Sequence, residues 1–208
     1  MKSQGRSSFL IRRFCGTVDY VIKSVKTVEN GLKGSSMGKK NKQEKGDKTN
    51  VMRLLEQHKI PYLYHRLEDK DVTNGEEVAH LLGEDPRLVF KTLVTVGSRT
   101  KDHFVFVIPV AEELDLKKAA KAVGEKSIAM IKSKELLPLT GYIHGGCSPI
   151  GMKKSFVTIF DISAKDKEKI YFSGGKVGYQ VEIAPADLPK ILHVQYEDLV
   201  KEEMIKEE

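Results

Sequence analysis

Lys91 is the first residue whose type and position could do chemistry. It lies in residues 88–96 (LVFKTLVTV), a strand-like run that is apolar on both alternating faces, and its same-face neighbours Val89 and Leu93 are apolar. Burying an ammonium group is costly unless an anionic partner meets it, so we expect a negative group beside Lys91. The alternative is an edge-strand lysine whose stem lies on apolar surface while its amine reaches water. Thr92, which alternation places on the opposite face, is the weaker candidate.

A glycine-rich segment, residues 141–151 (GYIHGGCSPIG), is the second candidate. It holds four glycines and one proline, a composition typical of a shaped backbone turn. Glycine lets main-chain N–H groups approach a ligand closely, where they can bind a phosphate or stabilise the oxyanion of a cleaved ester. An ordinary tight loop would have the same composition, so both interpretations stay open.

Other catalytic patterns fit poorly. The segment around Ser148 lacks the final glycine of a G-x-S-x-G elbow, with Ile150 in its place. Cys147 could be a nucleophile beside His144, but a lone buried thiol is the favoured interpretation. The other five histidines have no metal-ligand spacing, and the phosphate-loop and dinucleotide fingerprints are absent. The sequence therefore predicts no metal site.

The elements that must position these residues are predicted from apolar periodicity, caps and breakers. Pro61 ends the first helix, residues 73–76 (TNGE) offer a capping box to the second, and Gly83 ends it. The predicted helices cover residues 51–58, 73–83, 115–123, 133–137, 185–192 and 196–206. The predicted strands cover residues 62–67, 88–96, 103–109, 128–131, 157–161, 169–173 and 179–183.

The order of these elements favours an α+β fold. Residues 88–96 with 103–109, and residues 169–173 with 179–183, are predicted hairpins, and hairpins require antiparallel pairing. Helices and strands interleave without a regular βαβ repeat. We therefore expect a mixed sheet flanked by helices rather than a doubly wound parallel sheet.

Charge divides the chain near residue 50. Residues 1–50 hold 12 Lys/Arg and 4 Asp/Glu, so the total net charge of +6 leaves residues 51–208 at −2. The first 50 residues are predicted to be a disordered basic tail, residues 51–200 one folded domain, and residues 201–208 a charged end. The start of the tail has the composition of an organelle transit peptide, but an extension upstream of a start at Met37 explains it at least as well.

Cysteine usage and hydropathy point to a cytoplasmic protein. Cys15 and Cys147 lie far apart in sequence and form neither a disulfide framework nor a zinc pattern, which predicts a reducing compartment. No apolar run approaches the ~20 residues that cross a bilayer, so we expect no membrane span. Since residues 51–208 carry no positive excess, an RNA site would have to be a local patch. The candidate patches are Lys117, Lys118 and Lys121; Lys153 and Lys154; and Lys176, with an ordinary solvated surface as the alternative for each.

Four segments carry a resemblance to a known family. They are residues 90–93 (FKTL), 114–121 (LDLKKAAK), 140–151 (TGYIHGGCSPIG) and 171–178 (YFSGGKVG), in this order. Together they resemble the YbaK/EbsC family of aminoacyl-tRNA deacylases, which is related to the editing insertion of bacterial prolyl-tRNA synthetase. The resemblance runs from about residue 51 to residue 199.

The resemblance implies a mixed, strongly curved and partly barrel-like β-sheet flanked by helices. It also implies a pocket for the aminoacylated 3′ end of tRNA, with no metal, no cofactor and no DNA partner. By carry-over, Lys91 matches the family's essential lysine, and Gly145 matches the glycine whose backbone supports the reacting group. The residues expected to bind the substrate are Thr92, Gly146, Ser148, Pro149, Lys176, Leu67 and Gln180.

The best-known members of this family remove cysteine from prolyl-tRNA, where the substrate's own thiol attacks the ester. The resemblance therefore implies trans-editing of Cys-tRNA(Pro), in a transient complex with prolyl-tRNA synthetase. Leu67 replaces a pocket tyrosine of the Cys-specific members and Gln180 replaces an acidic residue, and both departures could alter selectivity. An editor of another small amino acid, such as alanine, and a non-catalytic tRNA-binding module stay open as alternatives.

Overall fold

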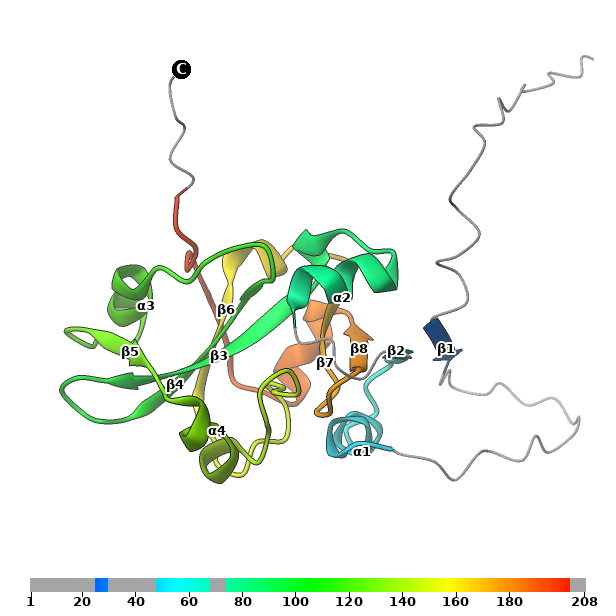
Figure 1. The fold of residues 1–208 in the computed structure, drawn as a ribbon, viewed down its shortest axis with the longest axis horizontal. Coiled ribbons are helices and arrows are strands. Elements are labelled where there is room, and N and C mark those ends of the chain that lie inside the picture. Colours follow the sequence, from blue (N-terminus) through cyan, green and yellow to red (C-terminus); the bar gives the residue numbers. More distant parts are fainter. Residues whose placement is uncertain (1–24, 30–47, 68–73, 203–208) are drawn as a thin grey trace, which may run out of the picture.

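Two β-sheets form the centre of the described structure (Figure 1). The computed structural model describes residues 25–29, 48–67 and 74–202. The four-stranded sheet has the order β1 (Val25–Glu29), β2 (Leu63–Leu67), β8 (Tyr179–Ile183) and β7 (Ile170–Ser173). The five-stranded sheet has the order β5 (Ile128–Met130), β3 (Phe90–Gly97), β4 (His103–Pro109), β6 (Val157–Asp161) and β9 (Val194–Glu197).

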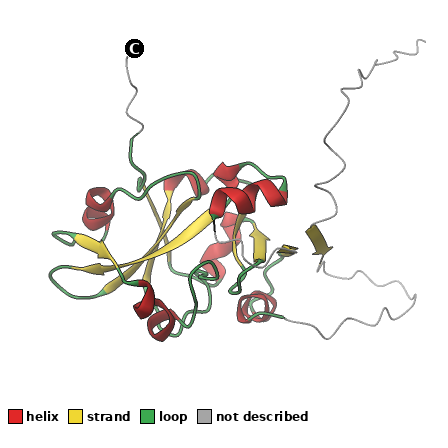
Figure 2. Ribbon diagram, in the orientation of Figure 1, coloured by secondary structure: helices red, strands yellow, loops and turns green. Residues whose placement is uncertain are grey.

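Short helices flank both sheets (Figure 2). The α-helices are α1 (Asn50–Gln57), α2 (Gly75–Leu82), α3 (Leu116–Ala122) and α4 (Ser133–Thr140). Three 3₁₀ turns, η1 (Pro86–Leu88), η2 (Ile162–Ala164) and η3 (Pro185–Lys190), complete the described elements. Local chemistry sets the bounds of α2, because the Asn74 side chain accepts a hydrogen bond from the N–H of Glu76 and Gly83 ends the helix at a φ of 70°.

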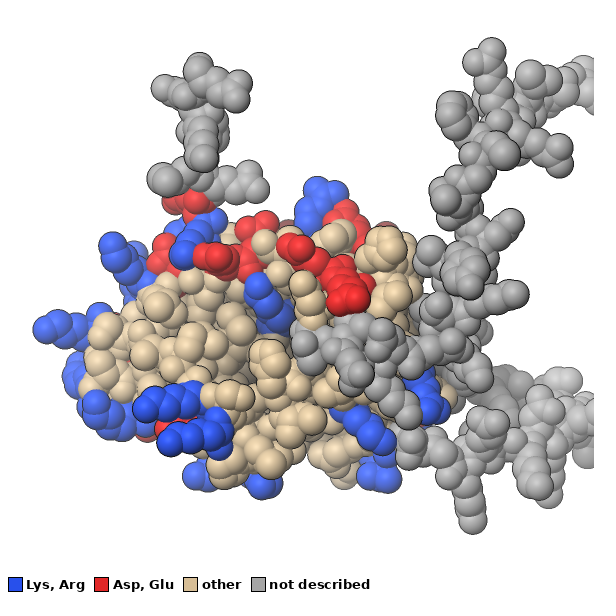
Figure 3. Space-filling view, viewed as in Figure 1, with Lys and Arg blue, Asp and Glu red and all other residues tan. Residues whose placement is uncertain are grey.

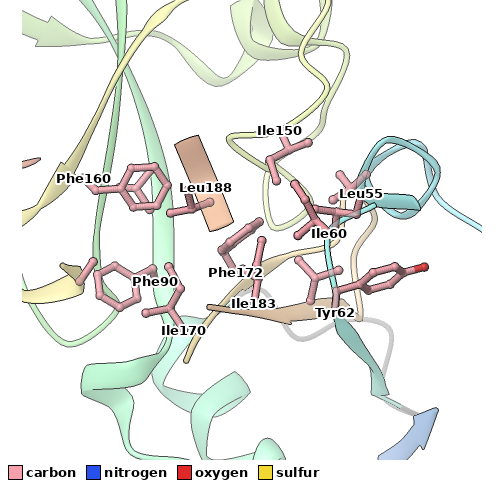
Figure 4. Packing of buried hydrophobic residues seen from close by; sticks show 14 of the residues in the cluster. Leu55, Ile60, Tyr62, Phe90, Ile150, Phe160, Ile170, Phe172, Ile183 and Leu188 are labelled. Carbon is pink, nitrogen blue, oxygen red and sulfur yellow. The ribbon is translucent and has the colours of Figure 1, made fainter. Parts of the chain in front are cut away.

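The two sheets share one hydrophobic core (Figure 4). The buried side chains labelled in Figure 4 come from both sheets, α1 and the segment after it, η3 and the glycine-rich loop: Leu55, Ile60, Tyr62, Phe90, Ile150, Phe160, Ile170, Phe172, Ile183 and Leu188. Burying each such aliphatic or aromatic side chain contributes about 1.5–3 kcal/mol. An isolated parallel bridge between Val89 and Tyr171 joins the start of β3 to β7, so the two sheets adjoin at that point.

The predicted pairing is confirmed at both hairpins, since β3 pairs with β4 and β7 with β8, each antiparallel. The fold is mixed α+β, as predicted, because β6 lies parallel to both β4 and β9. The strands form two sheets rather than the single sheet expected, and neither sheet closes on itself in the described residues. Strong curvature and partly barrel-like closure therefore stay predictions.

The helix predicted for residues 196–206 is wrong over the described part of that range. Its first two residues belong to β9, and residues 198–202 are not helical. The N–H of Leu199 donates to the buried carboxylate of Asp161 at 3.0 Å, and its carbonyl accepts from the N–H of Asp115 at 2.8 Å. These bonds to other segments satisfy the backbone in place of intrahelical bonds.

The N-terminal segment also departs from the prediction in one place. Its composition predicts disorder throughout residues 1–50, whereas Val25–Glu29 forms β1 and pairs with β2. Residues 1–24 and 30–47 lie outside the described residues, as does Thr73, which was expected in the cap of α2. The division of the chain at residue 50 therefore stays a prediction.

Candidate functional site

A cavity of about 370 Å³ opens where the two sheets adjoin. Its walls come from β3, α2, α4, the glycine-rich loop and facing residues of β7 and β8. The polar residues of the lining are Lys91, Thr92, Ser133, His144, Cys147, Ser173 and Gln180, and Gly145 adds backbone. Most of the rest is aliphatic, with Phe90 as the aromatic residue. An apolar cavity of this size with a few polar groups is typical of a site for a small ligand.

One wall of the cavity is the free edge of β3. This strand pairs with β4 along its length but with β5 only over its last three residues, and on that side the N–H of Ile131 donates to Val94 O at 3.2 Å. Peptide groups alternate between the two edges of a strand, so Thr92, two residues before Val94, also directs its N–H and C=O away from β4. No described strand pairs with Thr92 on this side. The cavity therefore has main-chain donors and acceptors in its wall.

The hydroxyl of Thr92 is a further hydrogen-bonding group without a partner. Thr92 Oγ1 is buried and has no hydrogen-bond partner among the described residues. A buried polar group without a partner costs about 1–3 kcal/mol, which a bound ligand can recover. Thr92 is thus a stronger candidate than strand alternation predicts, because it and Lys91 both line the cavity despite lying on opposite faces of β3.

Lys91 is half-buried, and its Nζ donates to the carbonyl of Val110 at 2.9 Å. Burial lowers the pKa of Lys91 below its ordinary value, while the carboxylates of Glu113, Glu76 and Glu112 act in the opposite direction. The hydrogen bond of Lys91 is made to a neutral carbonyl, so the expected negative group beside Lys91 stays a prediction. An ammonium group has three donors, so Lys91 retains N–H groups for an anionic ligand.

The glycine-rich loop reaches the cavity at Gly145. This residue has a φ of 75°, a conformation that L side chains rarely adopt. Behind it, Gly146 packs on the turn between β7 and β8, where a Cβ atom would lie 3.2 Å from the backbone N of Val177. Tyr142 O–H donates to Ile150 O at 2.7 Å and ties the two ends of the loop together. The shape of the loop therefore depends on glycine at the point where its backbone meets the cavity.

Cys147 also lines the cavity, but it is not arranged as an activated nucleophile. Burial raises the pKa of its thiol to about 12, although a hydrogen bond with Thr140 acts in the opposite direction. The thiol is therefore protonated at neutral pH, and the thiolate is the form that attacks. His144, its neighbour in the lining, is exposed. These features agree with a lone thiol that is not activated, although Cys147 is partly rather than fully buried.

The cavity contains four of the predicted site residues, namely Lys91, Thr92, Gly145 and Gln180. Gly146, Ser148 and Pro149 are buried within the loop and lie outside the lining. Ser148 shapes that loop, since its Oγ accepts from the N–H of Ile150 at 3.3 Å.

Leu67 and Lys176 also lie outside the lining. Leu67 is buried with Val78 and Tyr171 in a small cluster next to the α2 wall. Lys176 is exposed on the turn that supports Gly146, with its Nζ 5.4 Å from the ring centroid of Tyr179. Leu67 can therefore influence the cavity only through the residues that it packs against.

The walls contributed by α2, α4 and β7 were missed from the sequence. Ser173 pairs with Gln180 across the β7–β8 hairpin, and directly opposite residues of antiparallel strands share a face. The predicted hairpin could therefore have linked Ser173 to Gln180. No comparable signal existed for α2, whose close approach depends on Gly75, where a Cβ atom would lie 2.4 Å from Cγ1 of Val110.

Metal ligands do not gather in the described part of the chain, where no group of three or more His, Cys, Asp or Glu residues could hold an ion. In the same residues, no helix has the length and apolar character needed to cross a membrane.

Comparison with known proteins assigns this architecture to a family. A model of the aminoacyl-tRNA editing domain matches residues 69–191, more than half of the chain. The chain belongs to the aminoacyl-tRNA editing domain family. The resemblance inferred from the sequence is thereby confirmed. The matched range extends from before α2 to η3 and includes every residue that lines the cavity.

Two curated proteins are similar to the chain in sequence. The chain is 46% identical over 168 residues to the Enterococcus faecalis protein named "Putative Cys-tRNA(Pro)/Cys-tRNA(Cys) deacylase EbsC", a match that covers 80% of this chain and 100% of the relative. It is 30% identical over 112 residues to the proline–tRNA ligase of Shouchella clausii, covering 53% of this chain but 19% of that enzyme. The editing domain thus occurs both as a separate protein and as part of a larger one.

Solved structures agree with the fold. A structure described as a "putative trans-editing enzyme for prolyl tRNA synthetase" has a TM-score of 0.64 at 23% identity, covering 74% of this chain and 99% of the other. A hypothetical protein has a TM-score of 0.67 at 21% identity, covering 73% and 99%. At these identities the likeness supports the editing-domain fold alone.

Proposed function

We propose that this editing-domain protein is a trans-editing deacylase that removes mischarged cysteine from tRNA, chiefly from Cys-tRNA(Pro). The observation that carries the proposal is one cavity lined by Lys91, Thr92 and Gly145, where the hydroxyl of Thr92 is buried and has no hydrogen-bond partner among the described residues. The relative named for Cys-tRNA deacylation supports the choice of cysteine, since its whole length matches this chain.

The cavity favours a reaction in which the nucleophile comes from the substrate. Its one cysteine holds a protonated thiol, with a pKa of about 12, and its histidine is exposed. In the proposed step, the sulfur of the cysteinyl group attacks its own ester carbonyl, and the bond to the ribose oxygen breaks. The ribose oxygen takes the thiol proton, and the amino acid leaves as a cyclic thiolactone. The protein then has to hold the thiol near the carbonyl and stabilise developing negative charge.

Lys91 and Gly145 are proposed to supply that stabilisation. The ammonium group of Lys91 binds the terminal phosphate or the oxyanion, and its half-buried position strengthens the interaction because less water screens it. The backbone N–H of Gly145 donates to the carbonyl oxygen of the ester. Its positive φ would be strained with any L side chain, so glycine holds this peptide group in place at low cost.

Thr92 and Gln180 are proposed to orient the aminoacyl group. The free main-chain edge and the hydroxyl of Thr92 can accept hydrogen bonds from the α-ammonium group of the substrate. Gln180 lines the cavity from β8, where it pairs with Ser173 of β7. Gly146, Ser148, Pro149 and Lys176 are proposed to act by fixing the loop that presents Gly145, and Leu67 by supporting the α2 wall.

A transient encounter with prolyl-tRNA synthetase is a further part of this proposal. The similarity to a segment of a proline–tRNA ligase supports it, because the same domain is there joined covalently to the enzyme that makes the error. A separate protein would need to meet that enzyme, or its released product, to reach the same tRNA.

The test is a deacylation panel with the purified full-length chain and tRNA(Pro) charged with cysteine, alanine or serine. We expect fast release from Cys-tRNA(Pro) and slow release from the other two, with the thiolactone or its hydrolysis product detected by mass spectrometry. If alanine were released equally fast, the cysteine assignment would be wrong, and the protein would be an editor that uses water as the nucleophile. If the protein bound tRNA without releasing any amino acid, it would be a non-catalytic tRNA-binding module instead of an enzyme.

A further inference from the structure

The rim of the cavity carries opposite charges on two sides. The side formed by α4 and the end of the glycine-rich loop holds Lys132, Lys134, Lys153 and Lys154, which we call the α4 rim. Lys132 and Lys134 flank Ser133, a lining residue, while Lys153 reaches back to α4, with its Nζ 3.4 Å from Leu137 O. These four lysines form no ion pair with a described residue.

The other side of the rim is acidic. Glu76 and Glu77 lie in the first turn of α2, and Glu112 and Glu113 lie in the segment after β4, a group that we call the α2 rim. Glu76 follows the lining residue Gly75, and Glu112 lies two residues after the lining residue Val110, so both lie near the cavity. In Figure 3, Asp and Glu gather in the upper part of the visible face, whereas Lys and Arg follow its left and lower edges, near which α4 lies in Figure 1.

The α4 rim also exposes apolar side chains. Met130 lies just before it in β5, Leu137 is on α4 and Ile143 is in the glycine-rich loop, and all three are about half exposed. Met130 is itself part of the cavity lining. Exposed apolar groups among lysines suit a single-stranded nucleic acid, whose phosphates meet the charges while its unpaired bases contact the apolar groups.

A tRNA that places its terminal ester in the cavity must run its backbone out across one side of the rim. A phosphate crossing the α2 rim would meet the carboxylates of Glu76, Glu77 and Glu112, while Glu113 is paired with Lys201. One crossing the α4 rim would meet four lysines and the single carboxylate of Glu135, so the excess charge favours the α4 rim. We propose that the α4 rim is the docking surface for the single-stranded 3′ end of the tRNA and the adjoining acceptor stem. The α3 lysines take no part, since no residue of α3 lines the cavity and Lys118 is already paired with Asp198 at 2.8 Å.

This inference rests on the proposed function for its substrate, so its test separates docking from turnover. The variant is Lys132→Ala/Lys134→Ala in the full-length chain. The matched control is Lys117→Ala/Lys121→Ala on α3, which also removes two exposed lysines that form no ion pair with the described residues. Docking is read as the Kd of uncharged tRNA(Pro) over a series of salt concentrations, and turnover as kcat/KM on Cys-tRNA(Pro) and on 3′-O-cysteinyl adenosine.

We expect the α4 variant to bind tRNA about tenfold more weakly at low salt, with the slope of log affinity against log salt reduced by about one for each lysine that contacts a phosphate. The control should stay within about twofold. The loss of kcat/KM should be confined to the tRNA substrate and lie mainly in KM, because the small ester has no backbone to dock.

Equal weakening by both double variants would overturn the docking surface, and so would an unchanged affinity in the α4 variant. Loss of activity on the small ester would also overturn it, since the lysines would then be acting on the cavity. If the α4 variant weakens tRNA binding while the wild-type chain deacylates nothing, the docking surface stands and the proposed deacylase falls.

Discussion

The cavity and a neighbouring, partly buried polar cluster differ in whether their polar groups have hydrogen-bond partners within the protein. In the cluster, Tyr171 O–H donates to Glu84 Oε1 at 2.7 Å, and Lys169 Nζ donates to both, at 2.7 and 2.9 Å. Beside them, His65 Nε2 lies 3.1 Å from Glu182 Oε2. Among the residues that line the cavity, by contrast, Thr92 has a buried hydroxyl without a partner in the described residues.

The difference separates groups that hold the fold from groups that await a ligand. Glu84 follows α2 and Lys169 precedes β7, so the cluster fastens the end of α2 to the four-stranded sheet. Its members satisfy one another, and mutual satisfaction is what makes a buried polar network stabilising. Unsatisfied groups lower stability, so their presence in the cavity needs a compensating role in binding. Substitutions in the two places should therefore have opposite effects.

The largest effect is expected from Lys91→Ala. Removing a charge that stabilises a developing oxyanion should lower kcat/KM on Cys-tRNA(Pro) by about 10²–10³-fold. The free energy of unfolding should change by less than about 1 kcal/mol, because two effects oppose each other. The substitution removes the hydrogen bond from Lys91 to Val110 O, but it also removes the cost of half-burying an ammonium group. Single-turnover deacylation and urea denaturation measure the two quantities. Lys91→Met is the control that keeps the apolar stem, and it should be equally inactive; full activity in either variant would contradict the role of the charge.

Next in size is Tyr171→Phe in the polar cluster. The change removes a hydroxyl that both donates and accepts, so the free energy of unfolding should fall by about 1–3 kcal/mol. At a temperature where the variant is folded, kcat/KM should stay within about threefold of the wild type. A large loss of activity without a loss of stability would show that the cluster takes part in the reaction. The proposed division between stabilising cluster and ligand-binding cavity would then be wrong.

The same cluster has a pH signature. Burial alone would raise the pKa of Glu84, but hydrogen bonds from Tyr171 and Lys169 lower it overall below 4.5. A carboxyl group whose pKa is lower in the folded state contributes stability above its unfolded pKa, and that stability is lost as the pH falls through the folded value. The difference in stability between wild type and Tyr171→Phe should therefore shrink below about pH 4.

A smaller effect is expected from Thr92→Val. The substitution keeps the branched shape but removes the hydroxyl, so kcat/KM should fall about tenfold if that hydroxyl binds the aminoacyl group. Stability should stay the same or rise by up to about 1 kcal/mol, because a buried group without a protein partner is lost. Thermal unfolding and deacylation of the same preparation give both values. A clear loss of stability would mean that the hydroxyl is satisfied in the folded protein.

Much of the fold and part of the candidate site were predictable from local sequence. The β3–β4 and β7–β8 hairpins, the end of α2 at Gly83, the candidate Lys91 and the glycine-rich loop follow from alternation, turn residues and glycine content, whereas Gly145 itself was singled out by the family resemblance. Each depends on residues close together in the chain, where local propensity and structure agree.

The features that were missed depend on distant contacts. The last two residues of β9 were predicted as the start of a helix over residues 196–206, but Leu199 bonds to Asp161 and Asp115 instead of within a helix. The partner of Lys91 is the carbonyl of Val110, nineteen residues away and just after β4, which no charge pattern indicates. The cavity walls from α2 and α4 arise in the same way, from packing that brings separate segments together.

The smallest effect on activity is expected from Cys147→Ala. The thiol lines the cavity and would be the obvious nucleophile by residue type, yet burial raises its pKa to about 12, so almost none of it is thiolate at pH 7. The variant should keep kcat/KM within about threefold and lose roughly 1 kcal/mol of stability from the small space it leaves. Alkylation of the wild-type protein by iodoacetamide at pH 7 should be correspondingly slow. A loss comparable to that of Lys91→Ala would place a protein nucleophile in the cavity, and the substrate's thiol would no longer be needed to explain the reaction.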